Sequence, residues 1–141
     1  MTAKEAKILI GIDPGVNTGI CIIRRGYGID IKTVSMLEAM GMLLRLIEAN
    51  ERPDMFLRFE DARKRTWFDK SGPEKWQGAG SIKRDCQLWE EFCKRYGVAF
   101  EAVPPKNNAT KLKADFFKKL TGHTEKTDEH GRDAAMLIFG L

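Results

Sequence analysis

Short apolar runs near the N-terminus predict the first β-strands. Residues 8–12 (ILIGI) are continuously apolar, which is typical of a central strand buried on both faces. Residues 18–23 (TGICII) and roughly 28–35 predict the next two strands, joined by a turn at Arg25 and Gly26. Because these connections are short, we expect the three strands to form an antiparallel meander.

After the third strand the apolar spacing changes to a helical period. From Met36 onward, apolar residues recur at steps of three and four and predict an amphipathic helix that ends before Pro53. Residues 54–60 (DMFLRFE) and 98–103 (VAFEAV) predict two more strands, and the segment between them begins with a long polar stretch, 61–77. A second helix is then predicted from its apolar stripe: Ile82, Cys86, Trp89, Cys93 and Tyr96, with its end at Gly97.

Two helices complete the predicted order. Leu112, Phe116 and Leu120 mark a third helix, and residues 127–139 a last one. The order βββαβαβα indicates an α/β fold with a mixed five-stranded sheet and helices on both faces.

Length and composition narrow the protein class. The 141 residues fit one domain, 1–141, since domains run roughly 100–200 residues. No apolar run approaches the about 18 residues of a membrane span, and the N-terminus lacks the apolar stretch of a signal peptide. We therefore expect no membrane association and a cytoplasmic location. The net charge of +4 is compatible with a polyanionic partner. The three cysteines lack CxxC spacing and predict buried thiols in a reducing compartment.

Acidic residues occur at three separated places where the pattern predicts burial or a strand end. Asp13 ends the first apolar run, where burial of a carboxylate is costly unless a cation or several donors compensate. The simpler alternative is that Asp13 caps the turn DPGVNTG. Glu60 ends the fourth strand. If Thr127 caps the last helix, then Glu129, His130 and Asp133 share one face that continues toward the core.

Carboxylates from two strand ends and a helix start can converge only at a sheet edge. Several anions there repel one another unless divalent cations neutralise them. Mg²⁺ and Mn²⁺ prefer oxygen ligands and commonly act with substrate phosphates. The set therefore predicts metal-assisted phosphodiester chemistry.

Three sequence blocks carry a resemblance to a known family. IGIDPGVNTGICII at 10–23, Glu60 after a strand and HGRDAAMLI at 130–138 resemble the signature blocks of RuvC-type Holliday-junction resolvases, members of the RNase H-like superfamily. VPPKNNATKLKADFFKKLTG at 103–122 also resembles the family's basic stretch. The segment between Gly122 and Thr127 lacks a helix that the family usually has, so the chain resembles a compact, phage-like version.

The resemblance implies an RNase H-like fold and a homodimer that binds four-way DNA junctions. It also implies paired symmetric nicks with 5′-phosphate and 3′-hydroxyl ends, and two Mg²⁺ or Mn²⁺ ions in each active site. Asp13 would bridge the ions, Glu60 would hold one, and Asp133 and His130 would hold the ion that carries the attacking water. His130 is either a ligand or the base, and Glu129 is the alternative ligand in its place.

Two basic segments are the candidate DNA contacts. Segment 104–119 has five lysines against one aspartate: Lys106, Lys111, Lys113, Lys118 and Lys119. Segment 61–77 places basic residues beside aromatic residues that could stack on unpaired bases: Arg63, Lys64 and Arg65 with Trp67 and Phe68. The alternatives are a solvated helix face for the lysines and a minor core beneath the loop for the aromatic pair. We expect Asp61 to face away from Glu60 and His123 to lie at the surface.

Other functions stay open on sequence grounds. The chain could be an RNase H-like nuclease for other branched DNA or for RNA–DNA hybrids, or an inactive junction-binding module. A sugar-kinase or actin-type ATPase shares the IGIDxG pattern but needs two such domains, which 141 residues cannot supply.

Overall fold

The computed structural model describes residues 1–65, 72–105 and 112–141, and for residues 72–79 it describes the backbone alone. Five strands lie within this part of the chain: β1 (Ile8–Asp13), β2 (Asn17–Arg24), β3 (Gly28–Ser35), β4 (Met55–Glu60) and β5 (Ala99–Val103). The helices of the same part are α1 (Met36–Glu48), α2 (Gly72–Tyr96), α3 (Ala114–Thr121) and α4 (Glu129–Met136), with short 3₁₀ turns η1 (Arg52–Asp54) and η2 (Ala62–Lys64).

The strands form one mixed sheet in the order β3-β2-β1-β4-β5. β1, β2 and β3 pair antiparallel, which confirms the predicted meander, whereas β4 runs parallel to β1 and β5 runs parallel to β4. All residues of the central strand β1 are buried. Its apolar run is continuous because both of its faces are covered.

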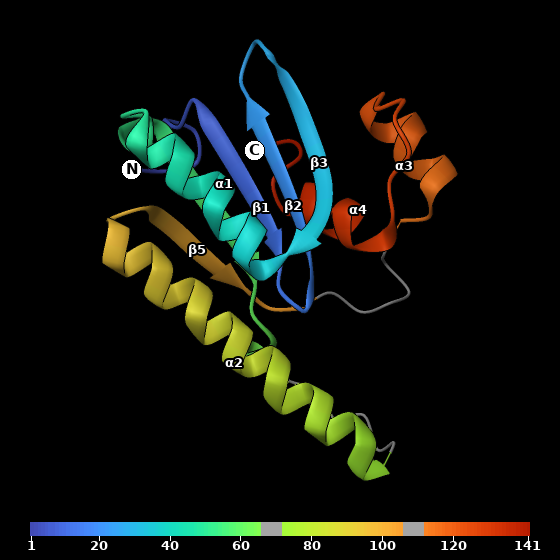
Figure 1. The fold of residues 1–141 in the computed structure, drawn as a ribbon. Coiled ribbons are helices and arrows are strands. Elements are labelled where there is room, and N and C mark those ends of the chain that lie inside the picture. Colours follow the sequence, from blue (N-terminus) through green and yellow to red (C-terminus); the bar gives the residue numbers. More distant parts are fainter. Residues whose placement is uncertain (66–71, 106–111) are drawn as a thin grey trace.

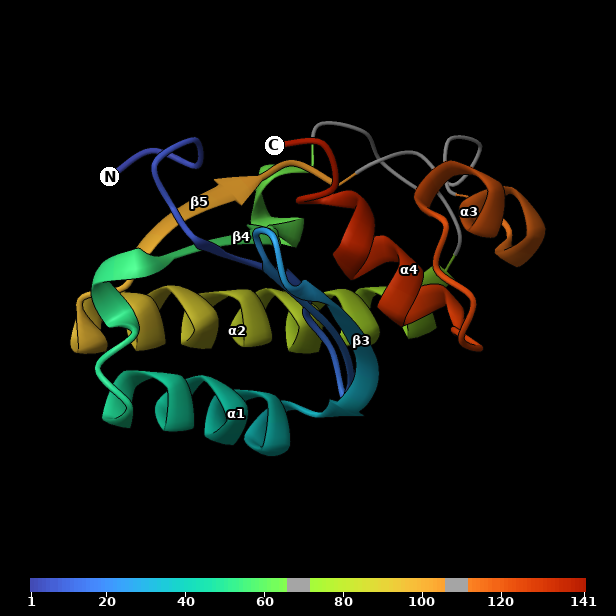
Figure 2. The same ribbon diagram turned by 90° about the horizontal axis from the view of Figure 1, so that it is seen from above.

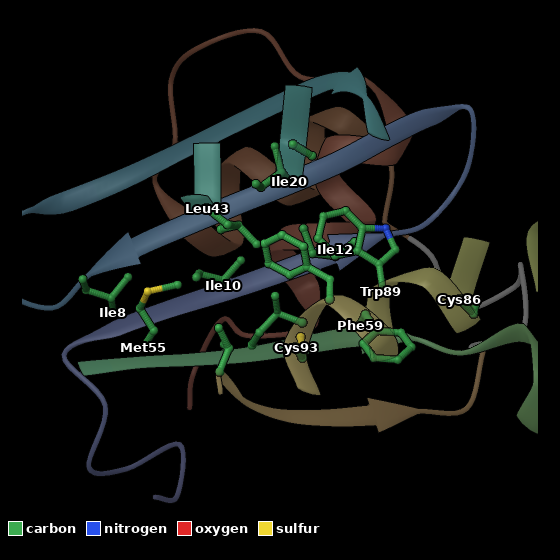
Figure 3. Packing of buried hydrophobic residues seen from close by; sticks show 14 residues of the cluster. Ile8, Ile10, Ile12, Ile20, Leu43, Met55, Phe59, Cys86, Trp89 and Cys93 are labelled. Atoms are coloured by element: carbon green, nitrogen blue, oxygen red, sulfur yellow. The ribbon is translucent and has the colours of Figure 1, made fainter. Parts of the chain in front are cut away.

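Helices cover both faces of the sheet, as predicted (Figures 1 and 2). α1 and α2 lie on one side, and α3 and α4 lie on the other (Figure 2). Because side chains alternate along a strand, Ile8, Ile10 and Ile12 face α1 and α2, where they join Leu43 and Trp89 in the larger core cluster (Figure 3). Leu9 faces the opposite way, into a second cluster built around α4.

The cysteines are buried within these two clusters. Cys86 and Cys93 of α2 lie in the larger one (Figure 3), and Cys21 of β2 lies in the other. All are free thiols, which confirms the prediction of buried cysteines without a disulfide.

Helix α4 approaches the sheet so closely that two strand positions have no room for a side chain. A Cβ atom at Gly11 of β1 would lie 2.0 Å from the carbonyl oxygen of Ala134, and one at Gly19 of β2 would lie 1.9 Å from that of His130. Real Cβ atoms essentially never come within 3.0 Å of another atom. The two glycines therefore fix how closely α4 packs on the sheet, and the small Ala134 and Ala135 of α4 are fully buried.

Helix α2 begins upstream of its predicted start. The sequence predicts a polar segment to residue 77 and a helix from Ile82, whereas the helix starts at Gly72. Residues 72–81 (GPEKWQGAGS) contain no aliphatic residue larger than alanine, so they give no periodic signal. Trp67 and Phe68, the predicted stacking pair, lie outside the described residues.

Helix α3 presents a different face to the core than the sequence predicts. Phe117 is fully buried, while Phe116 and Leu120 of the predicted stripe are exposed. The placement of His123 at the surface was wrong, because its side chain is buried and its ring meets that of Phe117 edge-on at 6.3 Å between centroids. A three-residue stripe does not distinguish adjacent helix faces, and the phenylalanine pair leaves either ring available for the core.

No helix of the described chain is both long enough and apolar enough to cross a membrane.

Candidate active site

The sheet brings two of the predicted carboxylates together at one edge. β1 and β4 are parallel neighbours, with Ile12 opposite Phe59, so Asp13 and Glu60 end adjacent strands at the same edge. Both side chains point to the α4 face, because Asp13 and Glu60 follow residues that face the other way. Asp13 is only 9% exposed and Glu60 is half-buried.

Helix α4 starts beside this edge, and Asp128 fixes its first turn. The Asp128 carboxylate accepts hydrogen bonds from the Gly131 amide at 3.0 Å and from the Thr33 hydroxyl of β3 at 2.5 Å. The predicted cap at Thr127 was wrong, since its carbonyl oxygen instead accepts from the Arg132 guanidinium at 2.8 Å. Burial alone would raise the pKa of the Asp128 carboxyl, but these hydrogen bonds and the nearby His130 outweigh it and hold that pKa below its usual value.

His130 of α4 contacts Asp13 of β1 directly. Its Nδ1 atom lies 3.1 Å from Asp13 Oδ2, although the two residues are 117 positions apart. The other ring nitrogen, Nε2, lies 3.8 Å from Glu129 Oε1. Glu129 is otherwise exposed, with its side chain 76% accessible. Asp13 therefore holds one nitrogen of the imidazole, and the second faces outward.

Asp133 lies one turn further along α4 than His130 and on the same side of the helix. The far end of α4 is tied to β4, since the Arg58 guanidinium donates to the Leu137 carbonyl at 3.1 Å and pairs with Glu101 of β5 at 3.0 Å. Along α4, the half-buried Asp133 thus lies between His130, which contacts β1, and Leu137, which contacts β4. These are the two strands that end in Asp13 and Glu60.

Carboxylate oxygens with one imidazole nitrogen form a donor set that suits Mg²⁺ or Mn²⁺. The ends of β1 and β4 place Asp13 and Glu60 at one sheet edge, and α4 brings His130 to Asp13 there. Among the described residues, however, no three or more histidine, cysteine, aspartate or glutamate side chains are grouped closely enough to hold a metal ion. The donor chemistry therefore fits a divalent cation, and a direct contact within the set joins His130 to Asp13.

The sequence matches no protein-family model and no curated protein. Among solved structures, the chain is similar to RuvC of T. thermophilus in complex with a Holliday junction substrate. The similarity has a TM-score of 0.53 and 17% sequence identity, and it covers 93% of this chain and 89% of that chain. The chain has a RuvC-like fold. Its mixed sheet flanked by helices on both faces is the RNase H-like arrangement that the sequence resemblance implied.

One residue that helps to build this edge of the RuvC-like fold was missed at the sequence level. Arg58 lies in the middle of β4, on the side that α4 covers, and contacts both α4 and β5. The signal was present in the alternation of MFLRFE. A charged residue in phase with Phe56 and Glu60, on the face opposite Leu57, needs a buried partner.

The predicted DNA-contacting residues that the structure describes differ in whether they are engaged within the protein or exposed. Arg63 is engaged by two carboxylates, Asp61 at 2.9 Å and Glu90 of α2 at 2.9 Å, so Asp61 is drawn toward α2. Lys64 donates to the Ala102 carbonyl at 2.8 Å, and Arg65 is exposed. The lysines of α3 and its start are exposed: Lys113, Lys118 and Lys119. Lys106 and Lys111 lie outside the described residues.

Proposed function

We propose that this chain is a metal-dependent endonuclease that cleaves branched DNA and resolves four-way junctions by paired symmetric nicks. The observation that supports the proposal is the contact of His130 with Asp13 in a RuvC-like fold, at the sheet edge where Glu60 ends the neighbouring strand. The similar RuvC structure holds a Holliday junction substrate, which supports branched DNA as the substrate class.

The local chemistry supports phosphodiester hydrolysis. Carboxylates that share a site favour divalent cations, and in the proposed site Asp13, Glu60 and Asp133 would hold Mg²⁺ or Mn²⁺, with His130 or Glu129 completing the set. When bound, such ions activate water and stabilise the departing 3′ oxygen. The products would carry 5′-phosphate and 3′-hydroxyl ends.

His130 is the residue suited to handle the proton of the attacking water. Its contact with Asp13 fixes the orientation of the ring, and its outward nitrogen Nε2 is the atom that can accept a proton or coordinate a cation. Gly19 sets how closely α4 approaches the sheet, because its lack of a side chain lets the His130 backbone lie against β2. The His130 ring can therefore contact Asp13 because α4 packs closely on the sheet.

Paired nicks require two such edges. One copy of the described chain presents one edge with this residue set, so we propose that a homodimer performs the two cuts. A DNA substrate of this kind would place the protein in the cytoplasm of a bacterial or phage-infected cell.

The test is cleavage of four labelled substrates, namely a four-way junction, a Y-fork, a linear duplex and an RNA–DNA hybrid, in Mg²⁺ and in Mn²⁺. Wild-type protein should nick the junction symmetrically and leave ends that a ligase seals. Asp13→Asn should bind the junction but not cut it. Asp30→Asn makes the same change at an exposed residue of β3 and should cut normally.

Cutting by Asp13→Asn at the wild-type rate would refute the assigned site. Equal cleavage of the hybrid and the junction would favour the broader RNase H-like activity, and binding without any cleavage would favour an inactive junction-binding module.

A further inference from the structure

Helix α3 exposes two large apolar side chains. Phe116 is 57% exposed and Leu120 is 47% exposed, whereas the adjacent Phe117 is fully buried. Phe116 and Leu120 are four residues apart and so lie next to each other on one face of the helix. Exposed apolar side chains that lie together on a surface are commonly found at binding sites.

Lysines flank this apolar pair on the same face. Lys113 precedes Phe116 by three residues and Lys119 follows it by three, and both are exposed. We call Lys113, Phe116, Lys119 and Leu120 the α3 stripe. Lys118 adds a further positive charge at the C-terminal turn, against the single acidic residue Asp115. The α3 stripe thus combines an aromatic ring with positive charge on each side.

Contacts to α4 hold the α3 stripe in place. The buried ring of Phe117 lies in one core cluster with Ala134 and Ala135 of α4, and the Arg132 guanidinium donates to the Leu112 carbonyl at 3.3 Å just before α3. Arg132 is a residue of α4 and directly precedes Asp133. α3 and α4 lie on the same side of the sheet (Figure 2). The α3 stripe is therefore anchored to the helix that carries the candidate active-site residues.

We propose that the α3 stripe binds the unstacked bases of the DNA branch point. Phe116 would stack on a base with Leu120 beside it, while Lys113 and Lys119 contact the phosphates on either side. This inference rests on the proposed function, because it assumes a DNA substrate at the neighbouring edge.

Charge complementarity favours DNA over a second copy of the chain as the occupant. Aromatic rings interleaved with positive charge are typical of surfaces that bind unpaired nucleotides. Lysine is depleted from protein–protein interfaces, and here two lysines border an apolar area of only two side chains. A protein interface centred on this pair would bury the charges of both lysines, while α3 offers one carboxylate, Asp115, four residues before Lys119.

The experiment compares binding to a four-way junction and to a linear duplex without divalent cations, so that no cleavage occurs. Phe116→Ala should weaken junction binding by about 5- to 150-fold, the range found for loss of one base–aromatic stack, with a much smaller effect on duplex. Phe116→Trp keeps a ring and should restore the affinity. Lys113→Ala and Lys119→Ala should weaken binding to both DNAs and lower the salt slope by about one each.

Leu37→Ala is the matched control. Leu37 is 82% exposed on α1, on the opposite side of the sheet, and its removal should leave both affinities unchanged. Circular dichroism of each variant establishes that the fold is retained.

Wild-type affinity of Phe116→Ala for the junction would overturn the proposal. Equal losses on junction and duplex would also overturn it, as would a loss of dimer in sedimentation with unchanged DNA affinity, which would place a second copy on the α3 stripe. Failure of the proposed function is a separate result, because it would appear as absent junction cleavage by the wild-type protein in Mg²⁺ and Mn²⁺ and not as a difference in binding between variants.

Discussion

Replacing Gly19 with alanine tests whether the close packing of α4 positions the candidate active site. Gly19 lies on β2, directly opposite Asp13 of β1 in the antiparallel pair. The backbone of His130 rests against it on the α4 face. A methyl group at this position removes no titratable group. It changes the distance between α4 and the sheet.

The required movement follows from the structure. The new Cβ atom would lie 1.9 Å from the His130 carbonyl oxygen and 2.4 Å from its carbon, and real Cβ atoms essentially never come closer than 3.0 Å. α4 must therefore retreat by at least the difference between 3.0 and 1.9 Å, which is 1.1 Å. Both contacts are backbone atoms, so no side-chain rotation relieves them. A misplacement of about 1 Å in an active site can cost about 100-fold in rate.

The assay is single-turnover cleavage of a four-way junction, together with urea denaturation. Gly19→Ala should cut about 100-fold more slowly and lose about 1–3 kcal/mol of unfolding free energy, the usual range for overpacking. Gly41→Ala is the matched control, since Gly41 lies in α1 with no atom within 4 Å of its added Cβ. It should cut normally and gain about 0.5–1 kcal/mol. Wild-type cleavage and stability in Gly19→Ala would show that the glycine does not set the position of α4.

Two further predictions concern buried titratable groups. Burial alone would raise the pKa of the Asp61 carboxyl, but the hydrogen bonds and charge of Arg63 outweigh it and lower that pKa. Ionised Asp61 therefore stabilises the fold above its unfolded-state pKa, and this contribution is lost as the pH falls through the lower folded-state pKa. In urea denaturation Asp61→Asn should be less stable than wild type at about pH 7, and the difference should shrink as the pH falls below about 4; a difference that stays constant at lower pH would contradict this origin. Burial also raises the pKa of the thiols, so at about pH 8 an aromatic disulfide reagent should label them only after denaturation; labelling of the folded protein would contradict their burial. The raised values are about 12, about 11 and about 12 for Cys21, Cys86 and Cys93.

The sheet could be predicted from the sequence because its signals are local. The continuous run at 8–12 and the short connections identify the central strand and the antiparallel meander that it begins, and the structure confirms both. Asp13 and Glu60 could be placed at one edge because each directly ends a strand.

What the sequence could not predict depends on contacts between distant segments. The cap of α4 is Asp128 rather than its neighbour Thr127 because Thr33 of β3 reaches Asp128, and nothing local distinguishes the two. The buried face of α3 likewise depends on which of two adjacent phenylalanines meets His123. The meeting of His130 with Asp13 requires the depth of α4 on the sheet, which Gly11 and Gly19 set.

The contact between Asp13 and His130 also has a consequence for biosynthesis. It joins the first strand of the fold to its final helix, across 117 positions. Proteins are made from the N-terminus, and their early segments start to fold first. A nascent chain of this protein can form the meander while the partner of Asp13 has not yet been translated. The proposed cutting activity would thus appear only when translation has passed α4, and a message broken upstream of Glu129 would yield a product that lacks His130 and Asp133.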